Sequence, residues 1–480
     1  MKNCKVKIKR VEFAAELEGV TEVFAKLDGA AVLGGNEGGC GANRFSAWMA
    51  EPVEIFEFRL GEDDPFGRLE SVLGKYKLSG PMPEDLPAGM FACGWVGFFG
   101  YELGRYIESI PDTAVDDLGL PVVRLGFYDR AVCYDHVNRE WYAAAGEFEG
   151  EEWTAEEKFR ELEKLIERSC ECRAATDADA DMEGVEPANI ECNISRREYF
   201  DAFERIKEYI HDGDVYQINF SQRFRCDYAA DPVKLYQWQN RHNPSPYAAF
   251  IKGEEWSVVS ASPELFVRVQ DGKISTKPIK GTRARVSGAD AERINKKHFD
   301  QLAGCEKEQA ELNMIIDLER NDLTRVCRYG TIKVVQPRTI EAYPTVYHAV
   351  ATVEGELREK QGRGTVCDIL RAMFPGGSIT GAPKIRSMEI IDELEPTARS
   401  VYTGSIGFIG LDGSACLNIA IRTVIIRGNS AYVQTGGGVV ADSQPQAEWD
   451  ETITKARALL AGIAAVGRTR VSDPEIKDGK

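Results

Sequence analysis

Short runs that alternate apolar and polar residues, separated by glycine, recur through residues 1–145. Clear examples are 53–58, 122–127 and 131–134. Alternation with a period of two is typical of strands that bury one face. The segment 89–105 places aromatic residues among five glycines, which favours tight packing of strands. The N-terminal part is therefore expected to be rich in β-structure.

The chain changes character after a charged amphipathic helix predicted at 151–169. Residues 175–186 are acidic and small, which is typical of a linker or an extended loop. Beyond it, Ser195 and Glu198 form a capping-box pattern that begins a helix ending near residue 212. Further elements of both kinds are expected downstream: strands at 215–224, 402–409 and 416–426, and helices at 305–320 and 446–462. The pattern is mixed α+β.

Composition excludes several classes of function. A formal net charge of -18 over 480 residues argues against general nucleic-acid binding, which needs a basic surface. No run of about 18 apolar residues is present, so no membrane span is expected. The N-terminus lacks an apolar signal core, and the 12 cysteines are scattered without a Cys-x-x-Cys pair. We therefore expect a cytoplasmic protein with reduced thiols.

One stretch, 276–285, constrains a lysine unusually tightly. Pro278 biases the residue before it towards an extended conformation, and Gly281 lets the backbone turn sharply or approach a ligand. Lys280 is thereby held at a bend. Such an amine can act as a nucleophile if burial or nearby cations keep it deprotonated. The alternative, a solvated lysine in a turn, stays open on this stretch alone.

Two predicted helices carry paired carboxylates. Glu308 and Glu311 share one helix face, and Glu448 and Glu451 repeat this spacing on the last long helix. Four carboxylates from two helices could hold a hard divalent cation, although each pair alone is equally typical of a solvated face. His348 has apolar neighbours, and no histidine cluster has the spacing of zinc ligands.

Other motifs point to a polar cavity. On the strand predicted at 215–224, Gln217 shares a face with Asn219 and Ser221, and such a face can line a cavity or meet bulk water. Arg422 is a lone charge in an apolar strand, where arginine is usually paired with a carboxylate of the protein or of a ligand. The glycines at 436–438 could present backbone amides to an anion.

Taken together and in order, these motifs resemble those of the chorismate-utilising enzymes, which include the anthranilate, aminodeoxychorismate, isochorismate and salicylate synthases. The matching stretches are 212–219, 260–266, 278–283, 308–311, 317–323, 374–384, 436–438 and 448–455. The resemblance implies a large antiparallel two-sheet β-sandwich with helices packed outside, to which both halves of the chain contribute strands. It also implies an N-terminal subdomain at 1–170, an acidic linker at 171–190, a chorismate-binding catalytic domain at 191–468 and a tail at 469–480.

The same resemblance assigns roles to side chains. Glu311 and Glu451 match direct magnesium ligands, while Glu308 and Glu448 match carboxylates that hold its waters. Glu264 matches the general acid that protonates the departing C4 hydroxyl of chorismate. Thr282 and His348 match residues near the ring carboxylate and are counted with the catalytic groups. The residues that match substrate-binding positions are Gln217, Gly281, Ser378, Tyr402, Arg422, Gly436, Gly438 and Lys455.

Two positions sort the family members. Isochorismate and salicylate synthases carry a lysine base where this chain has Gln217, so addition of water is disfavoured. Anthranilate synthases carry alanine where this chain has Lys280, whereas the first components of aminodeoxychorismate synthases carry lysine. The resemblance therefore implies attack of Lys280 on C2 and amination at C4, towards 4-aminobenzoate and folate, with ammonia from a separate glutamine amidotransferase. The alternatives are anthranilate synthase component I and a non-catalytic, chorismate-binding regulatory subunit.

A departure from the family pattern lies near residue 35. Gly35 stands where relatives usually carry a serine of a tryptophan pocket, and glycine cannot supply the hydroxyl. Tryptophan binding by this chain is therefore an open question. The candidate wall residues are Gly35, Arg44, Phe45, Pro246, Tyr247 and Ala248.

Overall fold

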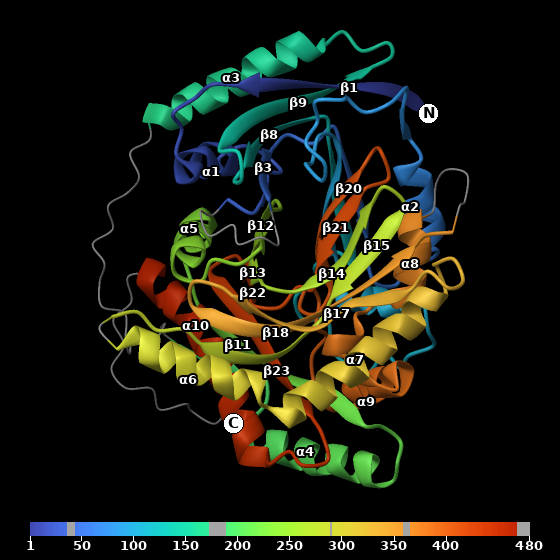
Figure 1. Cartoon of the computed structure of the whole chain (residues 1–480), viewed down its shortest axis with the longest axis vertical. Coiled ribbons are helices and arrows are strands. Elements are labelled where there is room, and N and C mark those ends of the chain that lie inside the picture. The colour runs from blue at the N-terminus through green and yellow to red at the C-terminus, as the bar shows by residue number, and fades with distance from the viewer. Residues whose placement is uncertain (36–43, 172–188, 289, 359–364, 468–480) are drawn as a thin grey trace.

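Pairing between distant parts of the chain builds two large sheets with helices around them (Figure 1). The structure is a computed structural model that describes residues 1–35, 44–171, 189–288, 290–358 and 365–467. Within the described residues, the paired strands are antiparallel except for the parallel pair β1–β5. The linker predicted at 175–186 falls outside the described residues.

The first sheet has 13 strands. In order across the sheet they are β10 (Glu191–Cys192), β11 (Gln217–Asp227), β23 (Ser430–Val439), β22 (Thr423–Arg427), β13 (Trp256–Ser262), β12 (Tyr247–Lys252), β2 (Ala31–Leu33), β3 (Phe45–Met49), β8 (Arg130–Asp135), β9 (Glu140–Phe148), β1 (Lys2–Val11) and β5 (Tyr76–Leu78), with β19 (Gly381–Ala382) beside β11. The two halves of the chain meet in it where β12 pairs with β2, through Phe250 opposite Val32.

The second sheet has 10 strands. In order they are β16 (Ile279–Ala284), β18 (Val346–Glu356), β15 (Lys273–Lys277), β14 (Leu265–Gln270), β21 (Ala415–Asn418), β20 (Ser405–Gly410), β6 (Gly94–Phe99), β7 (Val123–Tyr128) and β4 (Glu54–Phe58), with β17 (Lys333–Ala342) beside β18. Here the halves meet where β20 pairs with β6. The expectation of two antiparallel sheets built from both halves is confirmed.

Helices cover the outside of the two sheets (Figure 1). They are α1 (Leu17–Ala25), α2 (Pro65–Leu73), α3 (Ala155–Glu171), α4 (Arg196–His211), α5 (Pro232–His242), α6 (Ala291–Ala303), α7 (Glu306–Thr324), α8 (Thr365–Met373), α9 (Lys384–Leu394) and α10 (Pro445–Gly467), with 3-10 turns η1 (Tyr101–Tyr106) and η2 (Gly377–Ile379). One buried apolar cluster joins side chains of both sheets, such as Phe127 and Phe220, to helical ones such as Leu312.

Several local predictions are confirmed. The strands predicted at 53–58, 122–127 and 131–134 correspond to β4, β7 and β8. The capping box is present: the amide of Glu198 donates to the Ser195 hydroxyl at 3.3 Å, and the amide of Ser195 donates to the Glu198 carboxylate at 2.8 Å. Helices α7 and α10 cover the regions predicted at 305–320 and 446–462 and extend beyond them.

The single strand predicted at 416–426 is wrong. The structure ends β21 at Asn418 and begins β22 at Thr423, and the two strands belong to different sheets. The chain passes from one sheet to the other between them, with Arg422 in the left-handed region at φ 50°. Most of the run is apolar because both strands and much of the crossing are buried, so its periodicity does not reveal the break.

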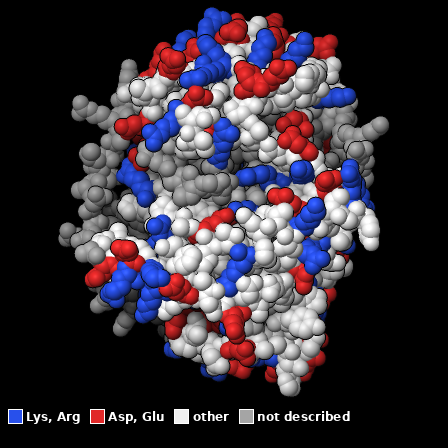
Figure 2. Space-filling view, viewed as in Figure 1, with Lys and Arg blue, Asp and Glu red and all other residues white. Residues whose placement is uncertain are grey.

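No described helix is both long and apolar enough to cross a bilayer. On the face shown in Figure 2, basic and acidic side chains are interspersed, so the described residues there form no extended basic patch.

The glycines of 89–105 lie where strands pack closely, as predicted. In β6, a Cβ added to Gly97 would lie 1.9 Å from the carbonyl oxygen of Arg124 on the neighbouring β7. The backbones approach there more closely than any other residue would allow.

We expect Gly97→Ala to lower the free energy of unfolding by about 1–3 kcal/mol, because an added methyl group in a packed sheet forces the strands apart. Chemical denaturation of the purified protein measures this. The matched control is Gly304→Ala at the end of α6, where the nearest atom would be 3.4 Å away. Equal stability of the two variants would contradict the described packing of β6 against β7.

Candidate active site

The predicted site residues come from both sheets and from two helices. Gln217 lies on β11, while Gly436 and Gly438 face it on the paired strand β23. Lys280, Gly281 and Thr282 lie on β16 of the other sheet, and His348 lies opposite Thr282 on β18. Helix α7 carries Glu308 and Glu311, whereas helix α10, which packs on β23, carries Glu448, Glu451 and Lys455.

Lys280 lies at an irregular point of its strand. The pairing of β16 with β18 shifts register between Ile279 and Thr282, and Gly281 adopts a φ of 93°. A Cβ on Gly281 would lie 2.8 Å from a carboxylate oxygen of Glu308, so glycine is required for both conformation and space. The half-buried Lys280 Nζ donates to the carbonyl oxygen of Ser378 at 3.3 Å.

The surroundings of Lys280 favour the neutral amine. Burial lowers the pKa of Lys280, and the charge of Lys455 acts in the same direction. The carboxylates of Glu264, Glu311 and Glu451 oppose this shift without cancelling it. A lysine in this setting has more of the unprotonated, nucleophilic form than a lysine in water has.

Glu264 is suited to donate a proton. Its side chain is 4% exposed, and burial raises its pKa, against the opposing effects of the Ser378 hydroxyl and Lys280. The amide of Ile279 donates to one of its oxygens at 3.4 Å. The nearby Ser378 hydroxyl lowers the pKa of this carboxyl. Its oxygen is nevertheless buried without a hydrogen bond of normal geometry to any described residue.

His348 is held as a neutral ring. Burial lowers its pKa to about 3, and the charge of Arg422 adds to this shift. One ring nitrogen, Nδ1, lies 2.8 Å from the hydroxyl of Thr282, and Nε2 is buried with no partner among the described residues. The pair can therefore offer neutral hydrogen-bonding groups to a ligand.

Arg422 and Gln217 are polar groups without partners in the described part of the chain. The guanidinium of Arg422 is half-buried, forms no hydrogen bond or ion pair with the described residues, and has a pKa lowered by burial, whereas the Arg422 carbonyl oxygen accepts from the amide of Ala261 at 3.0 Å. Both amide atoms of the fully buried Gln217 also lack partners there. Buried polar atoms are normally satisfied, so these groups indicate a place for a polar, anionic ligand. Tyr402, 6% exposed, interacts through its hydroxyl with Asn219 on the same strand as Gln217.

The four glutamates form two pairs, one on α7 and one on α10. On α7, Glu308 accepts from Arg283 at 2.7 Å with one oxygen, and its other oxygen is buried without a partner among the described residues. Burial and the nearby carboxylates of Glu308 and Glu451 raise the pKa of Glu311, against the opposing charges of Lys280 and Lys307. The carboxylates of the two helices are therefore close enough to repel each other.

On α10, each glutamate has a local partner. Glu448 accepts from the Ser443 hydroxyl at 2.6 Å, and Glu451 pairs with Lys455 at 2.7 Å. Lys455 also donates to the carbonyl oxygen of Gly436 at 2.9 Å. Among the described residues, no three acidic, histidine or cysteine side chains are gathered closely enough to hold a metal ion. Glu311 and Glu451 influence each other electrostatically, but the two pairs form no closed cluster among the described residues.

The candidate tryptophan-pocket residues are brought together, although 36–43 beside them lie outside the described residues. The amide of Gly34 donates to the carbonyl oxygen of Ala248 at 2.7 Å, and that of Gly35 donates to the Ser46 hydroxyl at 2.7 Å. Pro246 is buried, and the buried Tyr247 hydroxyl has no partner in the described chain. Arg44 next to Phe45 forms a two-bond ion pair with Asp135.

Sequence reasoning missed Glu319, within the motif 317–323. It is 3% exposed on α7, and burial and Asp322 raise its pKa, against the opposing charge of Lys384. One of its oxygens would lie 3.5 Å from a Cβ on Gly377, next to Ser378. The three-residue spacing of Glu319 and Asp322 is the only signal the sequence offers, and it resembles an ordinary solvated face. Sequence reasoning also missed the buried ion pair of Arg399 and Glu395.

We expect Arg422→Met to raise the free energy of unfolding of the ligand-free protein by about 1 kcal/mol, because it removes a poorly hydrated charge that has no partner. Denaturation with urea measures the change. The matched control is Arg223→Met, which should destabilise, because Arg223 is ion-paired with Asp117 and donates to the carbonyl oxygen of Ala398. Equal destabilisation by both substitutions would show that Arg422 is not held for a ligand.

Known proteins are similar to this chain both in sequence and in fold. The chain is 37% identical over 432 residues to aminodeoxychorismate synthase component 1 of Salmonella typhimurium, covering 87% of this chain and 89% of that protein. It is 40% identical over 406 residues to anthranilate synthase component 1 of Pseudomonas aeruginosa, covering 84% and 80%. The crystal structure of anthranilate synthase component I from Streptococcus pneumoniae matches with a TM-score of 0.73 and 30% identity, covering 87% of this chain and 92% of that one.

The Escherichia coli isochorismate synthase MenF shares the fold, with a TM-score of 0.69 at 15% identity, covering 96% and 95% of the two chains. The family described as chorismate binding enzyme matches residues 41–461, which include every residue placed above in the candidate active site. The chain therefore belongs to the chorismate binding enzyme family.

Proposed function

We propose that this chain is the first component of an aminodeoxychorismate synthase, which converts chorismate and ammonia to 4-amino-4-deoxychorismate. The observation that carries the proposal is Lys280, a half-buried amine with a lowered pKa beside the buried acid Glu264. Relatives with this name and with the anthranilate synthase name are similarly close to the chain, so the choice depends on this residue.

In the proposed reaction, the neutral amine of Lys280 attacks C2 of chorismate, and the C4 hydroxyl leaves as water with the proton of Glu264. Ammonia then attacks C4 and expels the lysine from C2 as a neutral amine. One proton of the new ammonium group returns to Glu264, which restores the enzyme. The enolpyruvyl group stays on the ring, since no step breaks its bond.

The remaining residues would bind the two carboxylates of the substrate. Arg422, Tyr402 and the backbone amides of Gly436 and Gly438 would hold the enolpyruvyl carboxylate. Thr282, His348 and Lys455 would surround the ring carboxylate. The unpartnered guanidinium of Arg422 supports this assignment, because a carboxylate would supply the missing ion pair. Gln217 cannot remove a proton from water, so hydration of C2 is disfavoured.

Magnesium is the proposed cofactor, with Glu311 and Glu451 as ligands and with Glu308 and Glu448 holding its waters. The donor set suits this ion, since Mg²⁺ prefers carboxylate oxygens and keeps several waters, and one Glu308 oxygen is buried without a partner in the described chain. The pairs are not gathered into a closed cluster, so binding would require small movements of the side chains. A bound magnesium ion would hold the ring carboxylate and stabilise negative charge as C2 is attacked.

We further propose that ammonia comes from a separate glutamine amidotransferase subunit, which forms a heterodimer with this chain. The reaction would serve the synthesis of 4-aminobenzoate and folate in the cytoplasm. The relatives are each named component 1 of their synthase, which supports the existence of a second component.

Incubation with chorismate, Mg²⁺ and an ammonium salt tests the reaction, with the product identified by mass spectrometry. We expect a product that keeps the enolpyruvyl group, and loss of at least about 1000-fold in its rate with Lys280→Ala. Lys277→Ala is the matched control, since Lys277 pairs with Glu341 instead. Anthranilate and free pyruvate from the wild-type protein would assign the chain to the anthranilate synthases.

Glu311→Gln tests the proposed metal site. We expect this substitution to raise the Mg²⁺ concentration needed for half-maximal rate at least tenfold, because it removes a charged ligand. The control is Glu306→Gln, an exposed position on the same helix. Turnover that persists unchanged in excess chelator would exclude magnesium.

A further inference from the structure

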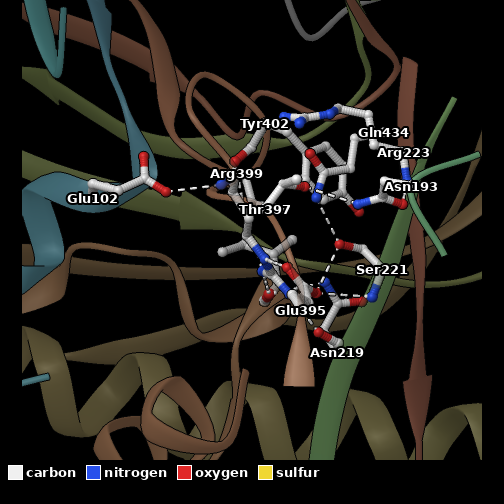
Figure 3. Close-up of polar contacts among 12 residues, drawn as sticks. Glu102, Asn193, Asn219, Ser221, Arg223, Glu395, Thr397, Arg399, Tyr402 and Gln434 are labelled. Carbon is white, nitrogen blue, oxygen red and sulfur yellow. Dashed lines mark hydrogen bonds and ion pairs between the residues drawn. The ribbon is translucent and has the colours of Figure 1, made fainter. Parts of the chain in front are cut away.

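A fully buried arginine is part of a polar network that includes Tyr402 and Asn219 (Figure 3). Arg399 is 1% exposed, and its guanidinium forms a two-bond ion pair with the buried Glu395: Nε donates to one oxygen at 2.8 Å and Nη2 to the other at 2.7 Å. Glu395 also accepts from the amide of Ser221 at 2.9 Å and from its hydroxyl at 2.7 Å. The pair is thereby tied to strand β11.

The guanidinium of Arg399 also donates to the Thr403 hydroxyl at 3.3 Å and to the backbone of two segments that carry predicted site residues. Nη2 donates to the carbonyl oxygen of Asn219 at 2.6 Å, and Nη1 donates to that of Ile379 at 3.0 Å. The side chain of Asn219 also donates to the Ile379 carbonyl, at 2.9 Å. Ile379 follows Ser378, whose carbonyl oxygen is the acceptor for Lys280. One guanidinium therefore fixes the backbone on which the Lys280 amine rests.

Arg399 also begins the segment that presents Tyr402. Ser400 and Thr403 have φ values of 56° and 60°, so this turn is unfavourable for residues other than glycine. The carboxylate of Glu102, from η1 in the N-terminal part, accepts from the amides of Arg399 at 2.8 Å and of Ser400 at 3.0 Å. Figure 3 shows Glu102 reaching this turn from the side opposite to β11.

Two aromatic rings complete the surroundings of the guanidinium. It lies 4.7 Å from the ring centre of Tyr101 and 5.7 Å from that of Tyr402. The first ring belongs to the N-terminal part and the second to the candidate site. Such contacts with a planar guanidinium are specific to arginine, because lysine cannot match its fork and its face together.

We propose that Arg399 is a positioning residue for the reaction assigned above, which sets Ser378 against Lys280 and holds Tyr402 through its contacts with Glu395, Asn219 and Ile379. The proposal rests on the proposed function for its catalytic consequence. Replacing a buried ion pair by apolar groups is often neutral for stability, so stability alone does not account for this network. The hydrogen bonds of Arg399 instead connect β11, η2 and the N-terminal part at the back of the site.

Two variants separate positioning from folding. Arg399→Lys keeps the positive charge and loses the fork, whereas Arg399→Met combined with Glu395→Gln removes both charges and leaves no unpaired ion. The control is Lys158→Met, which removes another fully buried cation. Lys158 lies on α3, away from the site, and pairs with Asp129 at 2.7 Å. All variants are first checked for a cooperative thermal transition.

The readouts are kcat and KM for chorismate, and the rate at which an acetylating reagent modifies Lys280, quantified by peptide mass spectrometry. For both Arg399 variants we expect kcat to fall at least tenfold, KM to rise less than kcat falls, and Lys280 labelling to change at least threefold. Lys158→Met should leave all three within twofold of wild type. Labelling does not require turnover, so it still decides the proposal if wild-type protein does not aminate chorismate and the proposed function fails.

Kinetic constants and Lys280 labelling within twofold of wild type in both folded Arg399 variants would overturn the proposal. Parallel changes of the same size in Lys158→Met would also overturn it, because they would reflect general loosening of the fold. If Arg399→Lys does not fold, the double variant gives the decision.

Discussion

Loss of hydration at a few charged groups is the constraint on which this site depends. Lys280, Glu264 and Arg422 are all removed from bulk water, and each has a pKa shifted towards its neutral form by burial. Lys280 and Glu264 partly compensate each other, whereas Arg422 has no partner in the described chain. A protein keeps such an uncompensated charge at a cost in stability, which a bound anion would offset.

The two sheets bring these groups together through their irregularities. The register shift in β16 and the left-handed Gly281 direct Lys280 towards Ser378. The crossing between β21 and β22 places Arg422 where the chain passes from one sheet to the other. Behind them, Arg399 connects β11 and η2 to Glu102 of the N-terminal part. The N-terminal part therefore contributes directly to the back of the site, although the residues predicted to bind chorismate or magnesium all follow residue 190.

Local features of the fold and the site could be read from the sequence because short-range rules govern them. The capping box at Ser195, the close approach at Gly281 and the alternating strands are of this kind. The break within 416–426 could not be predicted, since a mostly apolar run has the same pattern in one buried strand as in two. Arg399 and Glu395 gave no signal either. They stand four apart like many surface ion pairs, and only the folded chain shows that both are buried.

The central claim is that Lys280 forms a bond with the substrate. Its most direct test is the mass of the intact protein after incubation with chorismate and Mg²⁺ in the absence of ammonium, followed by peptide mapping. The account predicts an added mass equal to chorismate less one water, located on Lys280 and removed when ammonium is added. Turnover with ammonium and no trapped adduct at Lys280, by contrast, would contradict covalent attack and leave the lysine a binding role.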